Sequence, residues 1–118
     1  DDKRLKNYNV GVCLDTCHLF ASGYDVRDKK NVDVTMKQFA KVLGNDRLVV
    51  LHANDSKGEF GKHLDRHENI GRGLIGLAGF QAMAKHKVLG RLDWILETPK
   101  DNPKDDPANI AILKKMRK

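Results

Sequence analysis

The sequence predicts an α/β protein built on a parallel sheet, and three observations support this fold class. Three short apolar runs are spaced along the chain, and segments of helical periodicity separate and follow them. Each apolar run stops at a side chain that can bind a metal ion. The chain has 118 residues, so we expect residues 1–118 to form a single domain. Strands that alternate with helices form parallel sheets through right-handed crossovers.

The three apolar runs are the predicted strands. They comprise residues 10–14, 48–51 and 92–96, and each is short and nearly continuous in apolar side chains. This pattern is typical of strands that are covered on both faces. The residues at their ends are Asp15, His52 and Glu97.

Three further segments are predicted helices. Residues 32–43 place apolar side chains at helical spacing, and Gly44 follows as a stop signal. A second helix has a predicted inner face made of Leu77, Phe80, Met83 and Ala84. In the third helix we expect Asp106 as the cap and Pro107 at the first helical position. Its predicted inner face consists of Ile110, Leu113 and Met116.

The connections between these elements are expected to be irregular. Residues 1–7 are charged and indicate a helix end or a linker. Residues 19–30 contain Gly23 and many charges, which favours a loop. Residues 56–64 combine glycines with lysines and predict a mobile basic loop.

Composition limits the partners and the compartment. There are 22 Lys and Arg against 16 Asp and Glu, and the net charge of +6 favours an acidic partner such as nucleic acid. The alternative is an ordinary solvated surface, with the cations of residues 114–118 offsetting a helix dipole. Cys13 and Cys17 do not resemble a disulfide framework, and Cys13 is expected in the core, so a reducing intracellular compartment is expected. Neither a transmembrane stretch nor a signal peptide is predicted.

Six side chains form a candidate metal site. Three of them follow the predicted strands, and His18, Asp65 and His67 lie in the loops beyond these ends. Carboxyl ends of parallel strands meet at one edge, where active sites collect. Imidazole nitrogen and carboxylate oxygen suit zinc or a similar divalent ion. Two alternatives stay open: Asp15 could cap a helix beside a locally packed His18, and Asp65 and His67 could make only surface hydrogen bonds.

At these residues the chain resembles the endonuclease IV family of zinc-dependent apurinic/apyrimidinic endonucleases. The matching motifs are Gly-Val-Cys-Leu-Asp-Thr-Cys-His at 11–18, His-Ala-Asn-Asp at 52–55, Asp-Arg-His at 65–67, Gly-Arg-Gly-Leu-Ile-Gly at 71–76 and Leu-Glu-Thr at 96–98. They occur in order and span most of the chain. Any one of them is a weak signal, but together they are highly specific.

The resemblance implies a (β/α)8 TIM barrel of the xylose-isomerase-like superfamily, of which this chain is similar to the C-terminal portion of about three βα units. It also implies three zinc ions per complete enzyme and fewer here. By resemblance, His18, Asp65 and His67 are ligands of one zinc, and Asp15, His52 and Glu97 are ligands of a second. Asp15 and Glu97 are also the expected catalytic carboxylates. The family's two other histidines and its bridging glutamate come from earlier strands and are missing.

The activity implied by the resemblance is DNA repair. Zinc-activated hydroxide cleaves the phosphodiester 5′ of an abasic site in double-stranded DNA and leaves a 3′-hydroxyl and a 5′-deoxyribose phosphate. Lys57, Lys62 and Arg66 are the expected DNA contacts. Such an enzyme is expected inside the cell, in the cytoplasm of a prokaryote or in the nucleus or an organelle of a eukaryote.

The length of the chain leaves two alternatives to this activity. A complete barrel needs about 200 residues or more, and the chain opens on Asp1, so we expect a fragment whose remaining barrel lies upstream or in another chain. One alternative is a sugar isomerase or epimerase of the same superfamily. The other is a remnant that binds DNA without cutting it.

Overall fold

The computed structural model describes residues 10–117, and the predicted linker at residues 1–7 lies outside this range. Three strands form the main sheet, two short strands form a separate ribbon, and four α-helices accompany them. In chain order these elements are β1 (Val12–Asp15), α1 (Thr16–Ala21), α2 (Lys29–Val42), β2 (Leu48–His52), β3 (Asp55–Ser56), β4 (His67–Glu68), α3 (Gly76–Lys85), β5 (Asp93–Ile95) and α4 (Asp105–Met116). Two short 3₁₀ turns, Asn45–Arg47 and Leu89–Arg91, precede β2 and β5.

The main sheet is parallel, with the strand order β1-β2-β5. Its register places Asp15 opposite His52 and His52 opposite Ile95. Glu97 follows two residues after the end of β5. The predicted α/β architecture and all three predicted strands are therefore confirmed, and the strand ends meet at one edge.

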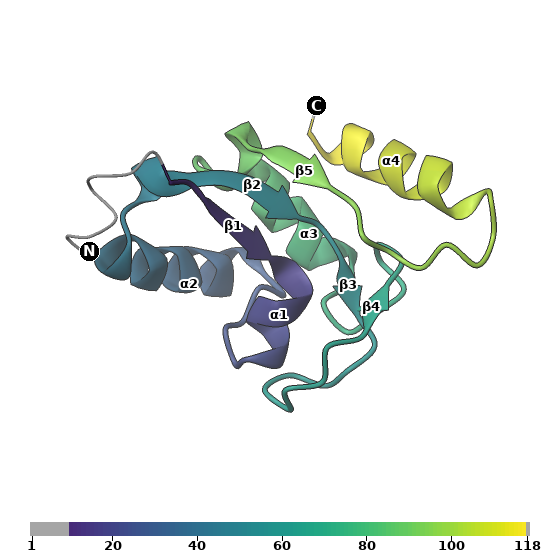
Figure 1. Cartoon of the computed structure of the whole chain (residues 1–118), viewed down its shortest axis with the longest axis horizontal. Helices are drawn as coiled ribbons and strands as arrows, with labels where there is room; N and C mark the ends of the chain where they lie inside the picture. The colour runs from purple at the N-terminus through teal and green to yellow at the C-terminus, as the bar shows by residue number, and fades with distance from the viewer. Residues whose placement is uncertain (1–9, 118) are drawn as a thin grey trace.

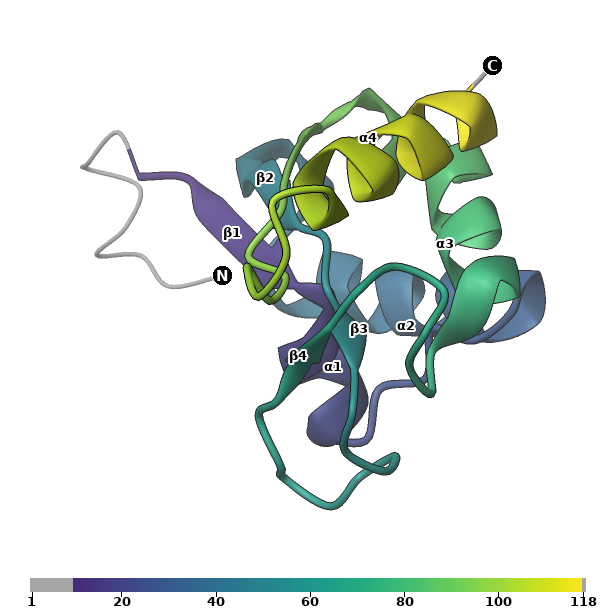
Figure 2. The ribbon, with the colours of Figure 1, turned by 90° about the vertical axis from the view of Figure 1, so that its right-hand side faces the viewer.

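The helices cover one face of this sheet, as Figures 1 and 2 show for α2, α3 and α4. The core lies between sheet and helices and includes Leu51, Phe80 and Met83, none of which has exposed surface. The opposite face is open, and about half of the surface of Val49 (51%) and Ile95 (49%) is exposed. Cys13 is exposed as well, so its predicted place in the core is wrong. No helix in residues 10–117 is long and apolar enough to cross a bilayer.

Several helices differ from the predictions in where they begin or end and in which side chains they bury. The Asp28 side chain accepts the Asn31 N–H, and α2 therefore begins a turn earlier than expected. Part of the loop predicted over residues 19–30 is helical, because α1 extends to Ala21. In α3 the predicted inward residue Leu77 is exposed.

The last helix has a different start and a different phase. It begins at Asp105, so Pro107 occupies its third position rather than its first. Asp106 does not cap the helix; its carboxylate accepts hydrogen bonds from Lys100 and Thr98. Leu113 is buried as predicted, as is Met116, but the predicted inward residue Ile110 is exposed. The buried side chain in that turn is Asn109.

A two-stranded ribbon shapes the loop between β2 and α3. Strand β3 pairs antiparallel with β4 and places Ser56 opposite His67. Backbone hydrogen bonds from Gly61 N to Phe20 O (3.0 Å) and from His63 N to Ala21 O (2.9 Å) join the intervening loop to α1. These hydrogen bonds restrain the loop of residues 56–64, which the sequence predicted to be mobile.

Candidate metal centre

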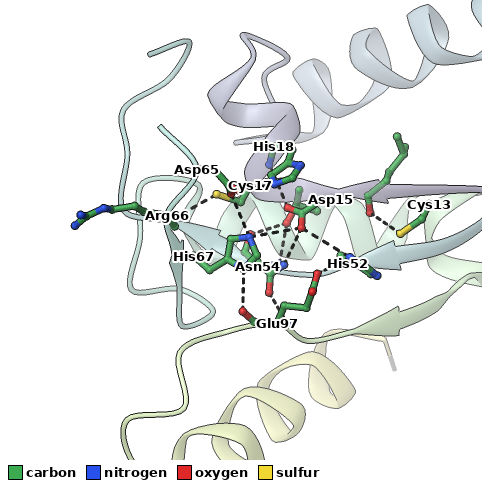
Figure 3. A network of polar contacts seen from close by, with 12 residues as sticks. Cys13, Asp15, Cys17, His18, His52, Asn54, Asp65, Arg66, His67 and Glu97 are labelled. Carbon is green, nitrogen blue, oxygen red and sulfur yellow. Dashed lines mark hydrogen bonds and ion pairs between the residues drawn. The ribbon is translucent and has the colours of Figure 1, made fainter. Parts of the chain in front are cut away.

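The six predicted ligand residues all line one open cleft at the carboxyl edge of the sheet. They come from the ends of β1, β2 and β5, from α1 and from the loop around β4, as Figure 3 shows. Residues far apart in sequence are therefore neighbours here because parallel strands end on the same side.

Within the cleft the six side chains form two groups of three. One group contains His18, Asp65 and His67, and the other contains Asp15, His52 and Glu97. In each group the candidate ligand atoms all lie within 4.8 Å of one another. These are the two groups that the resemblance implies.

The first group is held together by Asp65. Its Oδ2 lies 2.8 Å from His18 Nε2, and its Oδ1 lies 3.3 Å from His67 Nε2. More than half of the side-chain surface of both His18 (58%) and Asp65 (56%) is exposed, so an ion could reach this group from solvent.

The second group surrounds His52. Its Nδ1 lies 2.5 Å from Glu97 Oε1 and 3.9 Å from Asp15 Oδ2. Asp15 Oδ2 also lies 3.6 Å from His67 Nε2, so the Asp15 carboxylate is next to both groups.

Asp15 also caps α1, since its Oδ1 accepts the backbone N–H of His18 at 3.1 Å. Asp15 therefore caps the helix, as one of the alternatives predicted, and also lies next to the other candidate ligands. One carboxylate oxygen anchors the start of the helix, and the other faces the cleft.

His67 is oriented by the backbone beyond β5. Its Nδ1 lies 2.8 Å from the carbonyl oxygen of Glu97. A carbonyl only accepts hydrogen bonds, so Nδ1 bears a proton, and Nε2 is the ring nitrogen available to a metal ion when the ring is neutral. The Nε2 atom is the one that faces Asp15 and Asp65. A second partner that fixes the tautomer in this way is typical of histidines that bind metals.

Cys17 lies beneath the cleft. Its side chain is buried, and its Sγ lies within 4.8 Å of ligand atoms of Asp15 and His67. The thiol donates a hydrogen bond to Arg66 O at 3.5 Å. Burial is the main cause that raises the pKa of the Cys17 thiol, and this favours the protonated form.

Two polar residues near the cleft were not predicted as functional. Asn54 and Thr16 have no exposed surface, and they bond to each other and to the ligand-bearing segments. The sequence signals were that Thr16 and Asn54 lie within the motifs at residues 11–18 and 52–55, and that the polar pair Asn54-Asp55 follows soon after a strand.

Asp55 is a third unpredicted residue and organises the segment between β4 and α3. Its buried carboxylate accepts backbone N–H groups from Ser56 (2.8 Å), Gly71 (2.9 Å) and Ile75 (2.9 Å). A Cβ on Gly73 would lie 2.5 Å from Asp55 Oδ1, so this approach requires glycine. The buried carboxylate therefore explains Gly73, whereas Gly71 and Gly76 of the same motif adopt positive φ angles of 85° and 82°.

The predicted DNA contacts lie in the loop between β3 and β4. Lys57, Lys62 and Arg66 all have exposed side chains there. The loop packs on α1 through Phe60, whose ring centroid is 5.4 Å from that of Phe20. The Arg27 guanidinium lies over both rings, and its hydrogen bond to Asp25 lowers the pKa of that carboxyl.

Known proteins resemble this chain in sequence and in structure. Residues 3–116 match a family model described as xylose isomerase-like TIM barrel. A probable endonuclease 4 of Methanosphaerula palustris is 43% identical over 107 residues, which are 91% of this chain and 37% of the relative. An apurinic-apyrimidinic endonuclease of Caenorhabditis elegans is 49% identical over 98 residues, which are 83% of this chain and 25% of the relative.

A solved structure shows the same likeness. The crystal structure of endonuclease IV from Thermus thermophilus matches with a TM-score of 0.81 and 31% sequence identity. The match covers 95% of this chain and 40% of that chain. The chain thus spans between 25% and 40% of the length of these three proteins.

Proposed function

The chain belongs to the xylose isomerase-like TIM barrel family, and from this premise we propose that it is part of a zinc-dependent apurinic/apyrimidinic endonuclease. The observation that carries the proposal is the pair of three-residue groups in one cleft. The relatives named probable endonuclease 4 and apurinic-apyrimidinic endonuclease favour this activity over a sugar isomerase or epimerase of the same superfamily.

The spacing of the donor atoms fits zinc. Two ligands held at ~2.1 Å from an ion in tetrahedral geometry lie ~3.4 Å apart. The pairs Asp65–His67 and Asp15–His52, at 3.3 and 3.9 Å, lie on both sides of that value. The pairs His52–Glu97 and His18–Asp65, at 2.5 and 2.8 Å, are in direct contact, and all donor atoms of each group lie within 4.8 Å of one another. The donors are imidazole nitrogens and carboxylate oxygens, the ligand types that zinc accepts. We assign His18, Asp65 and His67 to one zinc and Asp15, His52 and Glu97 to a second.

The proposed reaction is hydrolysis of the phosphodiester 5′ of an abasic site in double-stranded DNA, with a 3′-hydroxyl and a 5′-deoxyribose phosphate as products. Bound zinc supplies activation of water near neutral pH and neutralisation of phosphate charge. Asp15 and Glu97 act as the catalytic carboxylates, because they hold the cofactor at the strand ends. Lys57, Lys62 and Arg66 hold the DNA phosphates beside the cleft, and no side-chain nucleophile is required.

We further propose that residues 1–118 form one domain and contribute part of a three-zinc site. The remaining ligands and barrel strands come from an upstream segment or from another chain. Because the proposed substrate is cellular DNA, we place the protein in the cytoplasm of a prokaryote or in the nucleus or an organelle of a eukaryote.

Substitution of His67 tests this function. In the full protein, His67→Ala is expected to abolish most incision of a duplex that contains one abasic site. The matched control is His63→Ala, since His63 is an exposed histidine of the loop that precedes β4 and belongs to neither ligand group. Zinc per chain is measured on the same samples.

Three results would contradict the proposal. Incision by His67→Ala at the wild-type rate would remove the metal assignment. Sugar turnover without incision would favour the isomerase or epimerase. DNA binding without incision by the full wild-type protein would favour the non-catalytic remnant.

A further inference from the structure

Asn54 joins the three strand ends of the main sheet beneath the ligand cleft. It lies two residues after the end of β2, and its side chain has no exposed surface. Its Nδ2 donates to Asp15 Oδ2 at 3.1 Å, and its Oδ1 accepts the backbone N–H of Glu97 at 2.7 Å. Figure 3 shows the amide between these two residues. One side chain thus connects the ends of β1 and β5.

The backbone of Asn54 is fixed as firmly as its side chain. The Thr16 hydroxyl accepts the Asn54 N–H at 2.9 Å and donates to the Asn54 carbonyl at 2.5 Å. Thr16 is fully buried and directly follows Asp15. The backbone N–H and carbonyl of Asn54 are therefore both bonded to the first residue of α1, and the side-chain amide is held by its own two hydrogen bonds.

The amide of Asn54 satisfies both partners. The Asp15 carboxylate accepts hydrogen bonds, and the Glu97 N–H donates one, so the bridging side chain needs one donor and one acceptor at its tip. This requirement also determines the orientation of the Asn54 amide, with Nδ2 toward Asp15 and Oδ1 toward Glu97. A carboxylate at this position would lack the donor, and an alanine would lack both groups.

The contacts of Asn54 fix two members of one ligand group. Asp15 has Oδ1 bonded to the His18 N–H and Oδ2 bonded to Asn54, so both of its oxygens are held. Glu97 is held at its backbone, and the His67 ring rests on the Glu97 carbonyl. A shift of Asn54 would therefore move Asp15, Glu97 and His67 relative to one another.

We propose that Asn54 is the positioning residue of the metal centre, which sets the spacing between the Asp15 carboxylate and Glu97. This inference rests on the proposed function, because it assumes that the cleft binds metal. Asn54 itself contacts no ion and takes no part in the reaction. Outer partners of metal ligands typically change metal affinity about 10- to 100-fold when they are removed.

Binding of Co²⁺ to the full protein tests the proposal, since its visible absorption reports ligand geometry as well as occupancy. Asn54→Ala is expected to weaken Co²⁺ binding about 10-fold or more and to change the absorption spectrum. Should this variant not fold, Asn54→Ser is measured in its place. The unfolding midpoint in urea is recorded for every variant.

Asn109 offers a matched control. It is also a buried asparagine, its Oδ1 accepts the Ile70 N–H at 2.9 Å, and its Nδ2 donates to Asn69 Oδ1 at 3.0 Å. Its Nδ2 also donates to Thr98 Oγ1 at 3.2 Å. Asn109→Ala therefore removes a similar buried amide whose hydrogen bonds go to none of the six ligand side chains. It is expected to lower the unfolding midpoint and to leave the Co²⁺ affinity and spectrum unchanged.

The outcomes separate this inference from the proposed function. If wild-type protein binds no Co²⁺ or Zn²⁺, the proposed function fails. If wild-type protein binds Co²⁺ and Asn54→Ala binds it with the same affinity and spectrum, only the positioning role fails. An equal loss of Co²⁺ affinity in Asn54→Ala and Asn109→Ala would also overturn it, because the effect would then follow from stability alone.

Discussion

His86 follows the end of α3, and its side chain binds the start of the next 3₁₀ turn in a way that depends on its protonation state. Its Nδ1 accepts the backbone N–H groups of Val88 at 3.1 Å and Leu89 at 3.3 Å. A protonated ring cannot accept these bonds. Burial lowers the pKa of His86 below its ordinary value of 6.5, and this effect exceeds the opposing attraction of Asp33, whose Oδ1 lies 3.8 Å from Nε2.

The stability of the protein should therefore fall in mild acid through His86. Its pKa is lower in the folded chain, so the unfolded chain binds more protons once the pH falls below the ordinary value. The stabilisation from the neutral ring is complete above pH 6.5 and decreases below it. We expect urea unfolding to show a steeper loss of free energy between pH ~7.5 and ~5 for wild type than for His86→Asn, whose oxygen keeps an acceptor near Nδ1. Parallel profiles for the two proteins would contradict this expectation.

At the scale of elements, α3 packs against the segment before α2 through Gly79. A Cβ at this position would collide with the Val26 carbonyl oxygen and would lie 2.8 Å from Ile75 Cγ2. Alanine normally stabilises a helix interior by about 0.5–1 kcal/mol relative to glycine. The clash involves backbone, which yields less easily than a side chain, so steric cost should exceed this gain.

We therefore predict that Gly79→Ala lowers the free energy of unfolding by about 1–3 kcal/mol, the usual cost of overpacking. Ala78→Gly on the exposed side of α3 calibrates helix propensity and should cost about 1 kcal/mol. Both variants are measured by urea denaturation. A Gly79→Ala variant that is more stable than wild type would show that the Val26 segment moves away without strain.

Strands and helices were predictable where the side-chain pattern alone decides them. The three strands follow from continuous apolar runs, and α2 follows from its helical spacing. The inner face of α4 was not predictable, because Asn109 is buried through hydrogen bonds to Asn69, Thr98 and Ile70. The burial of this polar side chain is explained by its hydrogen-bond partners, which lie up to 40 residues away in sequence.

For the whole molecule, the candidate site also combines features that local sequence patterns predict with features that depend on distant partners. The strand ends indicated three side chains and the loops beyond them three more, and the structure brings all six into one cleft. The family model confirms the barrel class that the motifs implied. Asn54 and Thr16 lie within the quoted motifs, but their roles were missed because their bonds connect segments 38 to 43 residues apart, and no local pattern records such pairs. Cys13 was misplaced because one sheet face is open, whereas the apolar pattern of β1 indicated cover on both faces.

Charge is the other property of the whole chain that bears on function. The net charge of +6 does not distinguish DNA contacts from an ordinary solvated surface, since lysines also lie at the exposed end of α4. Salt dependence does distinguish them, because each phosphate contact that is lost reduces the slope of log K against log[salt] by about 0.9. The test needs one lysine beside the cleft and one on a remote helix face.

Lys62 and Lys37 provide this pair, since both are exposed and Lys37 lies in α2 on the covered side of the sheet. We predict that Lys62→Gln in the full protein lowers the slope by about 1 and weakens binding at low salt, whereas Lys37→Gln changes neither. Fluorescence anisotropy measures both with a duplex whose phosphodiester 5′ of the abasic site is non-hydrolysable, so that binding is separated from incision. Equal slopes for Lys62→Gln and wild type would remove Lys62 from the DNA interface. An equal reduction of the slope in Lys62→Gln and Lys37→Gln would show that net charge acts without a localised contact.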